Sequence, residues 1–180
     1  EVIAAEGVVT IQADDTSKIE TEAKASAISI ASGVGFSFAG GGAVSLATIE
    51  TGVFAQVIGG INETALVVGL EGVVIRADSS SEIDNRSGAA AASYGLISAA
   101  GAGASARTLM ASTVDASTLH SRVRTDDDSA IQILANGSQQ GDANVSAFAV
   151  SGGGAMGVSL VEMTNRSEVS AWIGESTQIR

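Results

Sequence analysis

The chain has 180 residues, a formal net charge of −11, no cysteine and no proline. The lack of cysteine excludes a disulfide framework and a Cys-ligated metal, and the negative charge argues against a nucleic-acid partner, because phosphate binding needs clustered Lys and Arg. Aromatic residues make up 3% of the chain while glycines number 22, so small side chains predominate, which suits thin, closely stacked layers better than a wide core.

No signal peptide is visible, and no apolar run is long enough to cross a membrane, so we expect no membrane span. The sequence begins at Glu1 and stops at Arg180 in mid-pattern, which favours a mature or excised piece of a longer protein. Acidic, cysteine-free chains are common among secreted bacterial and archaeal surface proteins. We therefore expect a secreted or cell-surface location.

Residues 33–59 give the clearest local pattern, in which side chains alternate between larger apolar and small residues. A period of two predicts an extended strand with one buried face. The same plan returns in residues 149–174, and a weaker copy lies in residues 93–116. These copies predict a repeat protein made of strands.

The repeat is also visible in the segments that begin each unit. Glu6-Gly7-Val8-Val9 leads to Ala13-Asp14, and Glu71-Gly72-Val73-Val74 leads to Ala77-Asp78, an offset of about 64 residues that fits a supersecondary repeat. A third start at 129–133 leads to Ala135-Asn136. The units cover about 1–64, 65–126 and 127–180, which together form one elongated repeat domain.

Each unit is predicted to contain a short strand, an Asp/Asn/Ser turn, a long Ala-rich strand, a Gly-rich break and another long strand. Asp126-Asp127-Asp128 is a polar joint between the last two units. The expected strands are 7–13, 17–31, 33–39 and 43–58 in the first unit, 72–77, 82–99, 104–116 and 118–124 in the second, and 130–135, 143–151, 155–163 and 168–174 in the third.

Two all-β architectures fit these strands. In a parallel β-solenoid the coils stack, and each coil buries the inward face of its neighbour. In the alternative, Gly40-Gly41-Gly42 and Gly152-Gly153-Gly154 are turns of long antiparallel hairpins, since glycine accepts positive φ. The solenoid is favoured.

A family resemblance supports the solenoid. Gly157-Val158-Ser159-Leu160 and Ala171-Trp172-Ile173, followed by Ser176-Thr177, resemble the repeats of large secreted filamentous-haemagglutinin-type adhesins, including the leukotoxin-like filamentous adhesins. The middle unit departs from that pattern at Arg107 and at 120–122. The resemblance implies an elongated β-solenoid on an extracellular fibre, and it does not imply toxic activity.

Asparagine supplies the sharpest candidate sites. All five asparagines begin an Asn-x-Ser/Thr triplet, which predicts N-glycosylation on exposed edges or turns. The alternative is that they are turn asparagines or form a stacked amide ladder inside the solenoid. The five residues are Asn62, Asn85, Asn136, Asn144 and Asn165.

Signals for metal binding and catalysis are weak. The acidic segments at Asp14-Asp15, Asp78 and 126–128 could offer oxygen ligands to Ca²⁺, but they lack EF-hand or Gly-Gly-x-Gly-x-Asp spacing, so solvated turns are favoured. The one histidine, His120, has no metal-spaced partner. We expect no metal site, no cofactor and no enzyme activity.

The large aromatic residues are expected in the core or in stacks between coils. They are Phe36, Phe38, Phe54, Tyr94, Phe148 and Trp172.

Neither terminus carries a polar cap, since Val2-Ile3 and 173–179 are strand-like. A solenoid with uncapped ends is predicted to associate head to tail, and an interface that does not close gives a filament. We therefore expect a structural extracellular fibre or adhesin segment, coated with N-glycans, whose partners are copies of itself and a host or neighbouring cell surface. The alternative is a non-enzymatic binding module, an adhesin shaft with a ligand patch formed by Arg107, His120, Arg122 and Arg124.

Overall fold

The structure is a computed structural model that describes residues 1–180 except 5, 33–34, 61–63 and 127. All regular elements among these residues are β-strands. They are β1 (Val2–Ala4), β2 (Val9–Ile30), β3 (Phe36–Ile58), β4 (Ala65–Gly69), β5 (Val73–Tyr94), β6 (Ile97–Leu119), β7 (Ser121–Arg124), β8 (Ile131–Ser151), β9 (Gly154–Ile173) and β10 (Gln178–Ile179).

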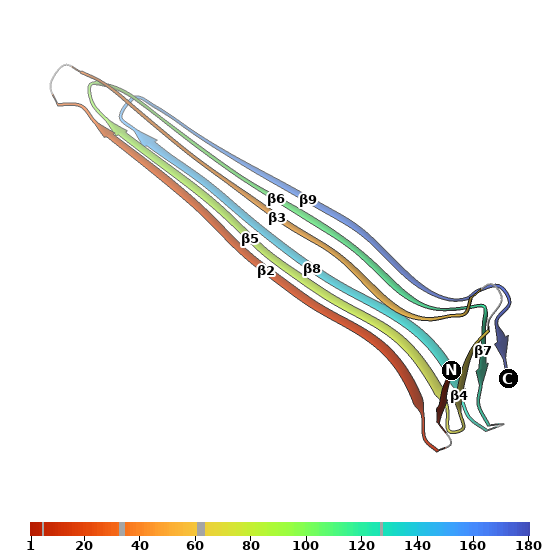
Figure 1. The fold of residues 1–180 in the computed structure, drawn as a ribbon. Coiled ribbons are helices and arrows are strands. Elements are labelled where there is room, and N and C mark those ends of the chain that lie inside the picture. Colours follow the sequence, from red (N-terminus) through yellow and green to blue (C-terminus); the bar gives the residue numbers. More distant parts are fainter. Residues whose placement is uncertain (5, 33–34, 61–63, 127) are drawn as a thin grey trace.

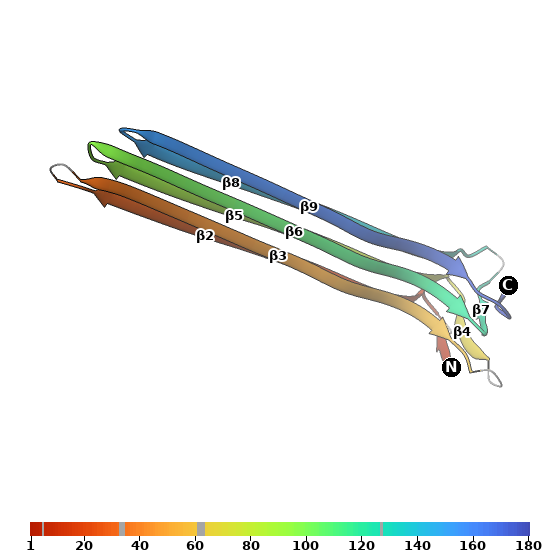
Figure 2. The same cartoon turned by 90° about the horizontal axis from the view of Figure 1, so that it is seen from above.

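The strands form three parallel sheets. Sheet A has the order β1-β4-β7-β10, sheet B the order β2-β5-β8 and sheet C the order β3-β6-β9. One short strand and two long strands make one coil, and the coils lie side by side (Figure 2). The chain is therefore a parallel β-solenoid, as predicted, and the alternative of antiparallel hairpins is wrong.

Sheets B and C face each other along a narrow blade (Figure 1). We call the end that carries sheet A, where both termini lie, the base. The opposite end, where β2 leads into β3, β5 into β6 and β8 into β9, is the tip. Side chains of B and C alternate between an inward row, which faces the other sheet, and an outward row.

The register of sheet B matches the sequence repeat. Ala13 pairs with Ala77 and Ala77 with Ala135, while their neighbours Asp14, Asp78 and Asn136 form the next level of the ladder. The Asp/Asn/Ser turns predicted here are wrong, because β2, β5 and β8 run through them without a break. These segments pair in register with the adjacent coil, and that pairing outweighs local turn propensity.

The predicted Gly-rich break is wrong in the first two units, whereas in the third unit Gly152 and Gly153 do separate β8 from β9. Gly40, Gly41 and Gly42 lie inside β3 and pair with β6. A Cβ added to Gly41 would lie 2.7 Å from the carbonyl oxygen of Ala90 in the opposite sheet, and one added to Gly157 would lie 2.9 Å from that of Ala147. Glycine is needed at these inward positions because the two sheets approach closely near the tip.

The space between the sheets narrows from base to tip. Aliphatic residues such as Val73, Ile75 and Val114 fill it near the base, and Ile83 packs with Met110 in the middle. Toward the tip the core consists of alanines, among them Ala91 and Ala102. The volume of the core side chains thus falls from the base of the blade to its tip.

The expectation that the aromatic residues fill the core is wrong. Phe36, Phe38, Phe54, Tyr94 and Phe148 all lie in outward rows and are exposed. The close spacing of the sheets leaves room inward only for small or slender side chains, so the larger rings are placed outside. Trp172 also points outward, but it contacts the neighbouring coil through its indole nitrogen.

Candidate assembly interface

The strands of sheet C are staggered relative to those of sheet B. β3 packs against both β2 and β5, and β6 packs against both β5 and β8. Each strand of sheet C thus covers a groove between two strands of sheet B. The sheet B strand in contact with β9 is β8, so β9 overhangs the third coil.

The overhang leaves the inward row of β9 uncovered. Val161 is 47% exposed and Val169 is 48% exposed, whereas Ala106 and Val114, which pair with them in β6, are both fully buried at 0%. Met163 and Ile173 belong to the same uncovered row. We call this row of β9 the open row.

The opposite end of the solenoid has a different surface. The inward residues of β3, such as Val53 and Val57, are already buried because β2 and β5 lie beneath them. What this end offers is the free backbone edge of β1, β2 and β3, each of which is the outermost strand of its sheet. The two ends are therefore complementary in shape.

Side chains at the two ends also correspond level by level. Val9 and Ile131 both pair with Val73, so they occupy one level of the ladder in the first and third coils. In the outward row of sheet C, Glu50 pairs with Ala111, which pairs with Arg166. If a second copy continued the stack, Arg166 of one copy would thus meet Glu50 of the next.

Asp115 links the three coils on the outer face of sheet C. Its carboxylate accepts hydrogen bonds from Gln56 Nε2 (2.9 Å) in the first coil and Ser117 Oγ (2.5 Å) in its own coil. From the third coil, Ser170 Oγ (2.8 Å) and Trp172 Nε1 (2.7 Å) donate to it. Burial alone would raise the pKa of Asp115, but these hydrogen bonds outweigh it and lower the pKa to about 2.

No motif in the sequence singles out Asp115. The available signal is that it is the only charged residue between Arg107 and Arg122. An isolated carboxylate among Ser, Thr, Val and Ala on an alternating strand needs hydrogen-bond donors from its neighbours.

The predicted glycosylation sites fall in different environments. Asn136 and Asn144 lie in the outward row of β8 and are exposed. Asn165 points inward, within the open row of β9, where its Oδ1 accepts a hydrogen bond from Ser167 (2.6 Å). Asn62 lies outside the described residues.

Asn85 is buried at 0% exposure between the sheets. Its Nδ2 donates to the carbonyl oxygen of Arg107 (2.9 Å) and to Thr108 Oγ1 (3.1 Å), and its Oδ1 accepts from Thr21 Oγ1 (2.9 Å). The same level of the ladder holds Thr21 and Ala143 in the adjacent coils, so this is a single bridging amide and not a ladder of asparagines. The folded chain has no space for a glycan on Asn85.

Asn136 belongs to a polar ladder on the outer face of sheet B. Its Nδ2 donates to Asp78 Oδ1 (2.8 Å). The pKa of Asp78 is lowered first by hydrogen bonding from Arg76 and then by this bond from Asn136. The acidic residues Asp14 and Asp78 lie in the outward rows of β2 and β5 and not in turns.

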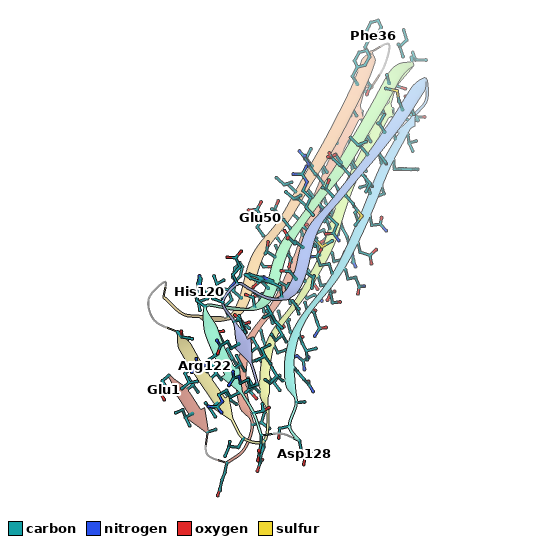
Figure 3. All side chains as sticks on the ribbon, turned by 90° about the vertical axis from the view of Figure 1, so that its right-hand side faces the viewer. Glu1, Phe36, Glu50, His120, Arg122 and Asp128 are labelled. Atoms are coloured by element: carbon teal, nitrogen blue, oxygen red, sulfur yellow. The ribbon has the colours of Figure 1, made fainter. Side chains whose placement is uncertain are left out.

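The residues of the predicted ligand patch are not brought together. His120 and Arg122 lie at the base (Figure 3), and Arg124 lies in the same short strand, β7. Arg107 lies in the middle of β6, about 40 Å from the end of that strand at about 3.3 Å per residue. It pairs there with Glu162 (3.4 Å).

The described residues contain no cluster of three or more His, Cys, Asp or Glu side chains arranged to bind a metal ion. None of the described segments is a helix of the length and apolarity that crossing a membrane requires. Comparison with protein-family models, with curated proteins and with solved structures finds no match for this chain.

Proposed function

We propose that this chain is a structural segment of a secreted, cell-surface fibre in which copies stack head to tail. The observation that carries the proposal is the open row of β9, which is exposed although the same row is buried in β6. A second copy whose β2 lies beside β8, and whose β3 lies beside β9, would cover that row and continue both sheets.

The backbone would supply much of the affinity. β8 and β9 present edges of 21 and 20 residues, and β2 and β3 offer edges of 22 and 23 residues. Parallel strand addition along such edges gives main-chain hydrogen bonds without special side chains. Long unprotected edges of this kind favour pairing with another chain.

Side chains are compatible with the same register. In the inward row at the base, Ile131 of one copy would meet Val9 of the next copy. Both residues are apolar, and each pairs with Val73 within one chain. In the outward row, opposite charges would meet at Arg166 and Glu50. Burial of the open row adds a hydrophobic contribution, because Val161, Met163, Val169 and Ile173 would lose their exposure.

The secreted location and the structural role are also supported by the resemblance of 157–160 and 171–173 to filamentous adhesin repeats. Within that role we propose N-glycans on Asn136 and Asn144, which project from an outer face that stacking leaves free. A glycan on Asn165 would occupy the space that the next copy needs, since Ile49 and Met110 fill the same level in β3 and β6.

The test is a substitution that blocks the open row. Val169→Lys places a charge on the surface that the next copy would cover, and we expect it to abolish polymers seen by electron microscopy and by sedimentation velocity. Thr164→Lys is the matched control, because it adds the same charge to the outward row of the same strand. The control should assemble like the unchanged protein.

Two results would contradict the proposal. One is a monodisperse unchanged protein at concentrations where strand addition should be complete. The other is equal assembly of Val169→Lys and the unchanged protein, which would show that copies do not meet through the open row. Circular dichroism of both variants checks that each still forms β-structure.

A further inference from the structure

The tip of the blade is free of charge in all three coils. Residues 25–49, 87–106 and 143–161 contain no Asp, Glu, Lys, Arg or His. Each of these segments includes the tip-side part of one long strand and the tip-side part of the long strand that follows it. The chain as a whole has 29 Asp, Glu, Lys and Arg residues, and those that the structure describes lie in the middle and at the base of the blade.

Apolar side chains cover the outer face of sheet C near the tip. Phe38, Val44 and Leu46 on β3, with Met156, Val158 and Leu160 on β9, all point outward and are exposed. Between them β6 contributes small residues, so that Phe38 and Met156 flank a shallow groove floored by Ala99 and Gly101. The groove and its walls carry no charge.

The outer face of sheet B is apolar over a shorter length. Ile28 and Ile30 on β2, Tyr94 on β5, and Phe148 and Val150 on β8 are exposed close to the tip. Farther toward the base this face becomes strongly polar, with Lys24, Arg86, Asp84 and Asp142 around one groove. The apolar surface thus includes both faces of the tip and the turn between them, where Leu96 is also exposed.

We propose that the tip of the blade inserts into the surface of a lipid bilayer. The distribution of the apolar side chains favours lipid over a second copy of the chain. A partner that packed on one face would leave the apolar residues of the other face exposed, whereas here apolar residues lie on both faces and at the turn between them. A medium that contacts both faces and the turn at once is the hydrocarbon region of a membrane.

The length of the apolar surface sets the depth of insertion. On sheet B it covers 90–94 in β5, about 16 Å at about 3.3 Å per residue. This is about half of a hydrocarbon core that is about 30 Å thick, so the tip reaches through one leaflet. The ring of charged side chains around Lys24, Asp84 and Arg86 would then lie at the level of the lipid headgroups.

Stacking of coils limits the cost of this insertion. Unpaired backbone groups are expensive in hydrocarbon, and in each coil the backbone near the tip pairs with the adjacent coil. Free edges remain on the outermost strands, which are β2 and β3 at one end and β8 and β9 at the other. The membrane proposal goes beyond the proposed fibre. Stacking in a fibre would favour insertion further, because the next copies would cover these edges.

Vesicle flotation tests the proposal with the whole chain. The protein is mixed with vesicles of phosphatidylcholine alone and with vesicles that contain one quarter phosphatidylglycerol. We expect flotation with both, and no gain from the anionic lipid, because the chain carries a net charge of −11. A protein that binds only anionic vesicles, or neither, would overturn the proposal.

Two variants locate the contact. Phe38→Glu places a charge in the tip, and Ile58→Glu places the same charge in the same outward row of β3 at the base; the two side chains are 67% and 58% exposed. We expect Phe38→Glu to lower the fraction bound at least about tenfold at fixed lipid, and Ile58→Glu to leave it unchanged. Met156→Glu, in another coil, should reproduce the effect of Phe38→Glu.

A fluorescence measurement gives the orientation. Trp172, the only tryptophan, lies near the base, so brominated lipids should leave its emission unchanged. Phe36→Trp adds a reporter at the labelled tip (Figure 3), and its added emission should be quenched. Quenching of Trp172 would mean that the base meets the membrane and would refute insertion by the tip.

The Val169→Lys variant separates this proposal from the fibre proposal. If it no longer assembles but still floats with vesicles, the tip binds lipid independently of stacking. If Phe38→Glu instead prevents association of copies in lipid-free solution, with no vesicle binding by the unchanged protein, the tip joins copies of the chain and the lipid proposal fails.

Discussion

Asp115 shows how a single outward residue can connect three coils. Its four hydrogen-bond donors come from β3, β6 and β9, so its charged form is favoured in the folded chain. The folded pKa of about 2 lies below the ordinary value of 3.8. The stabilisation from this carboxylate is therefore fully present above about pH 4 and is lost as the pH falls through about 2.

We predict that Asp115→Asn lowers the free energy of unfolding by about 2 kcal/mol at neutral pH, the equivalent of the pKa shift. The difference from the unchanged protein should shrink as the pH is lowered from 5 to 2. Urea unfolding at several pH values measures it. Asp142→Asn, on the exposed face of β8, should give a small difference, and an equally small effect of Asp115→Asn would disprove the role of the carboxylate.

Glycan occupancy should follow the position of each asparagine in the fold. We predict modified Asn136 and Asn144 in natively sourced protein, with Asn85 and Asn165 unmodified, because the first of these is buried and the second lies in the open row. Glycopeptide mass spectrometry measures each site. A glycan on Asn85 would mean that the fold around β5 is different, and unmodified Asn136 and Asn144 would remove the glycan coat from the proposal.

The triplet motif itself could not distinguish these sites. Asn85 and Asn165 both begin the identical sequence Asn-Arg-Ser, and both point inward. Position within the alternation decides exposure, and a shift of one residue would reverse it. The triplets predicted exposed edges or turns for all five asparagines, with an internal amide ladder as the alternative, and they did not assign any asparagine to an inward or outward row.

At the scale of the strand, the spacing of the two sheets depends on inward glycine. We predict that Gly41→Ala costs about 1–3 kcal/mol, because its Cβ would lie 2.7 Å from the Ala90 carbonyl oxygen and the sheets would have to separate. The adjacent Gly40 points outward, and an added Cβ meets nothing within 4 Å. Gly40→Ala should therefore be neutral or stabilise by about 0.4–1 kcal/mol through the unfolded state.

Thermal or urea unfolding measures the stability of Gly40→Ala and Gly41→Ala, which change adjacent residues of the same glycine triplet. Equal effects of Gly40→Ala and Gly41→Ala would contradict the close approach of the sheets. A mere propensity effect of alanine in a strand would act alike at both positions, so the difference between the variants isolates the contact with Ala90.

The sequence pattern predicted the strands, their repeat and their parallel stacking, but not their length or their buried face. Alternation over 33–59 indicates a strand, yet it does not say which of the two rows is inside. The larger residues Phe36, Phe38, Val44 and Leu46 suggested the buried row. The thin space between the sheets admits Ser37, Ala39 and Ala43 instead, and that spacing is a property of the paired sheets.

The open row of the candidate interface could not be predicted from the sequence either. The strand-like, uncapped termini at 2–3 and 173–179 predicted that the ends of the solenoid would associate with other copies of the chain. The stagger of sheet C over sheet B, which leaves β9 uncovered, depends on how two layers pack. No local pattern in β9 distinguishes it from β6 in this respect.

At the scale of the whole molecule, the proposed fibre has dimensions set by strand geometry. Three coils at about 4.8 Å each give an axial rise of about 14 Å per chain. The strands run across the fibre, and 23 residues of β3 at about 3.3 Å give a ribbon about 76 Å wide.

Fibre diffraction or cryo-electron microscopy of the polymer would measure both dimensions. We predict a strong reflection near 4.8 Å along the fibre and a repeat near 14 Å. A rise of about 28 Å would indicate that pairs of chains alternate in direction, which parallel continuation of sheets B and C does not allow. Fibres with strands along their length would refute the proposed stacking altogether.

The overhang of β9 gives such a fibre a polarity. An arriving chain would meet an uncovered apolar row at one end and only bare strand edges at the other, so the two ends would grow at different rates. A filament tethered to a cell by its β2 end would then elongate outward from the β9 end. A chain blocked in the open row could still join that growing end, where it would terminate further elongation and so set the length of the fibre.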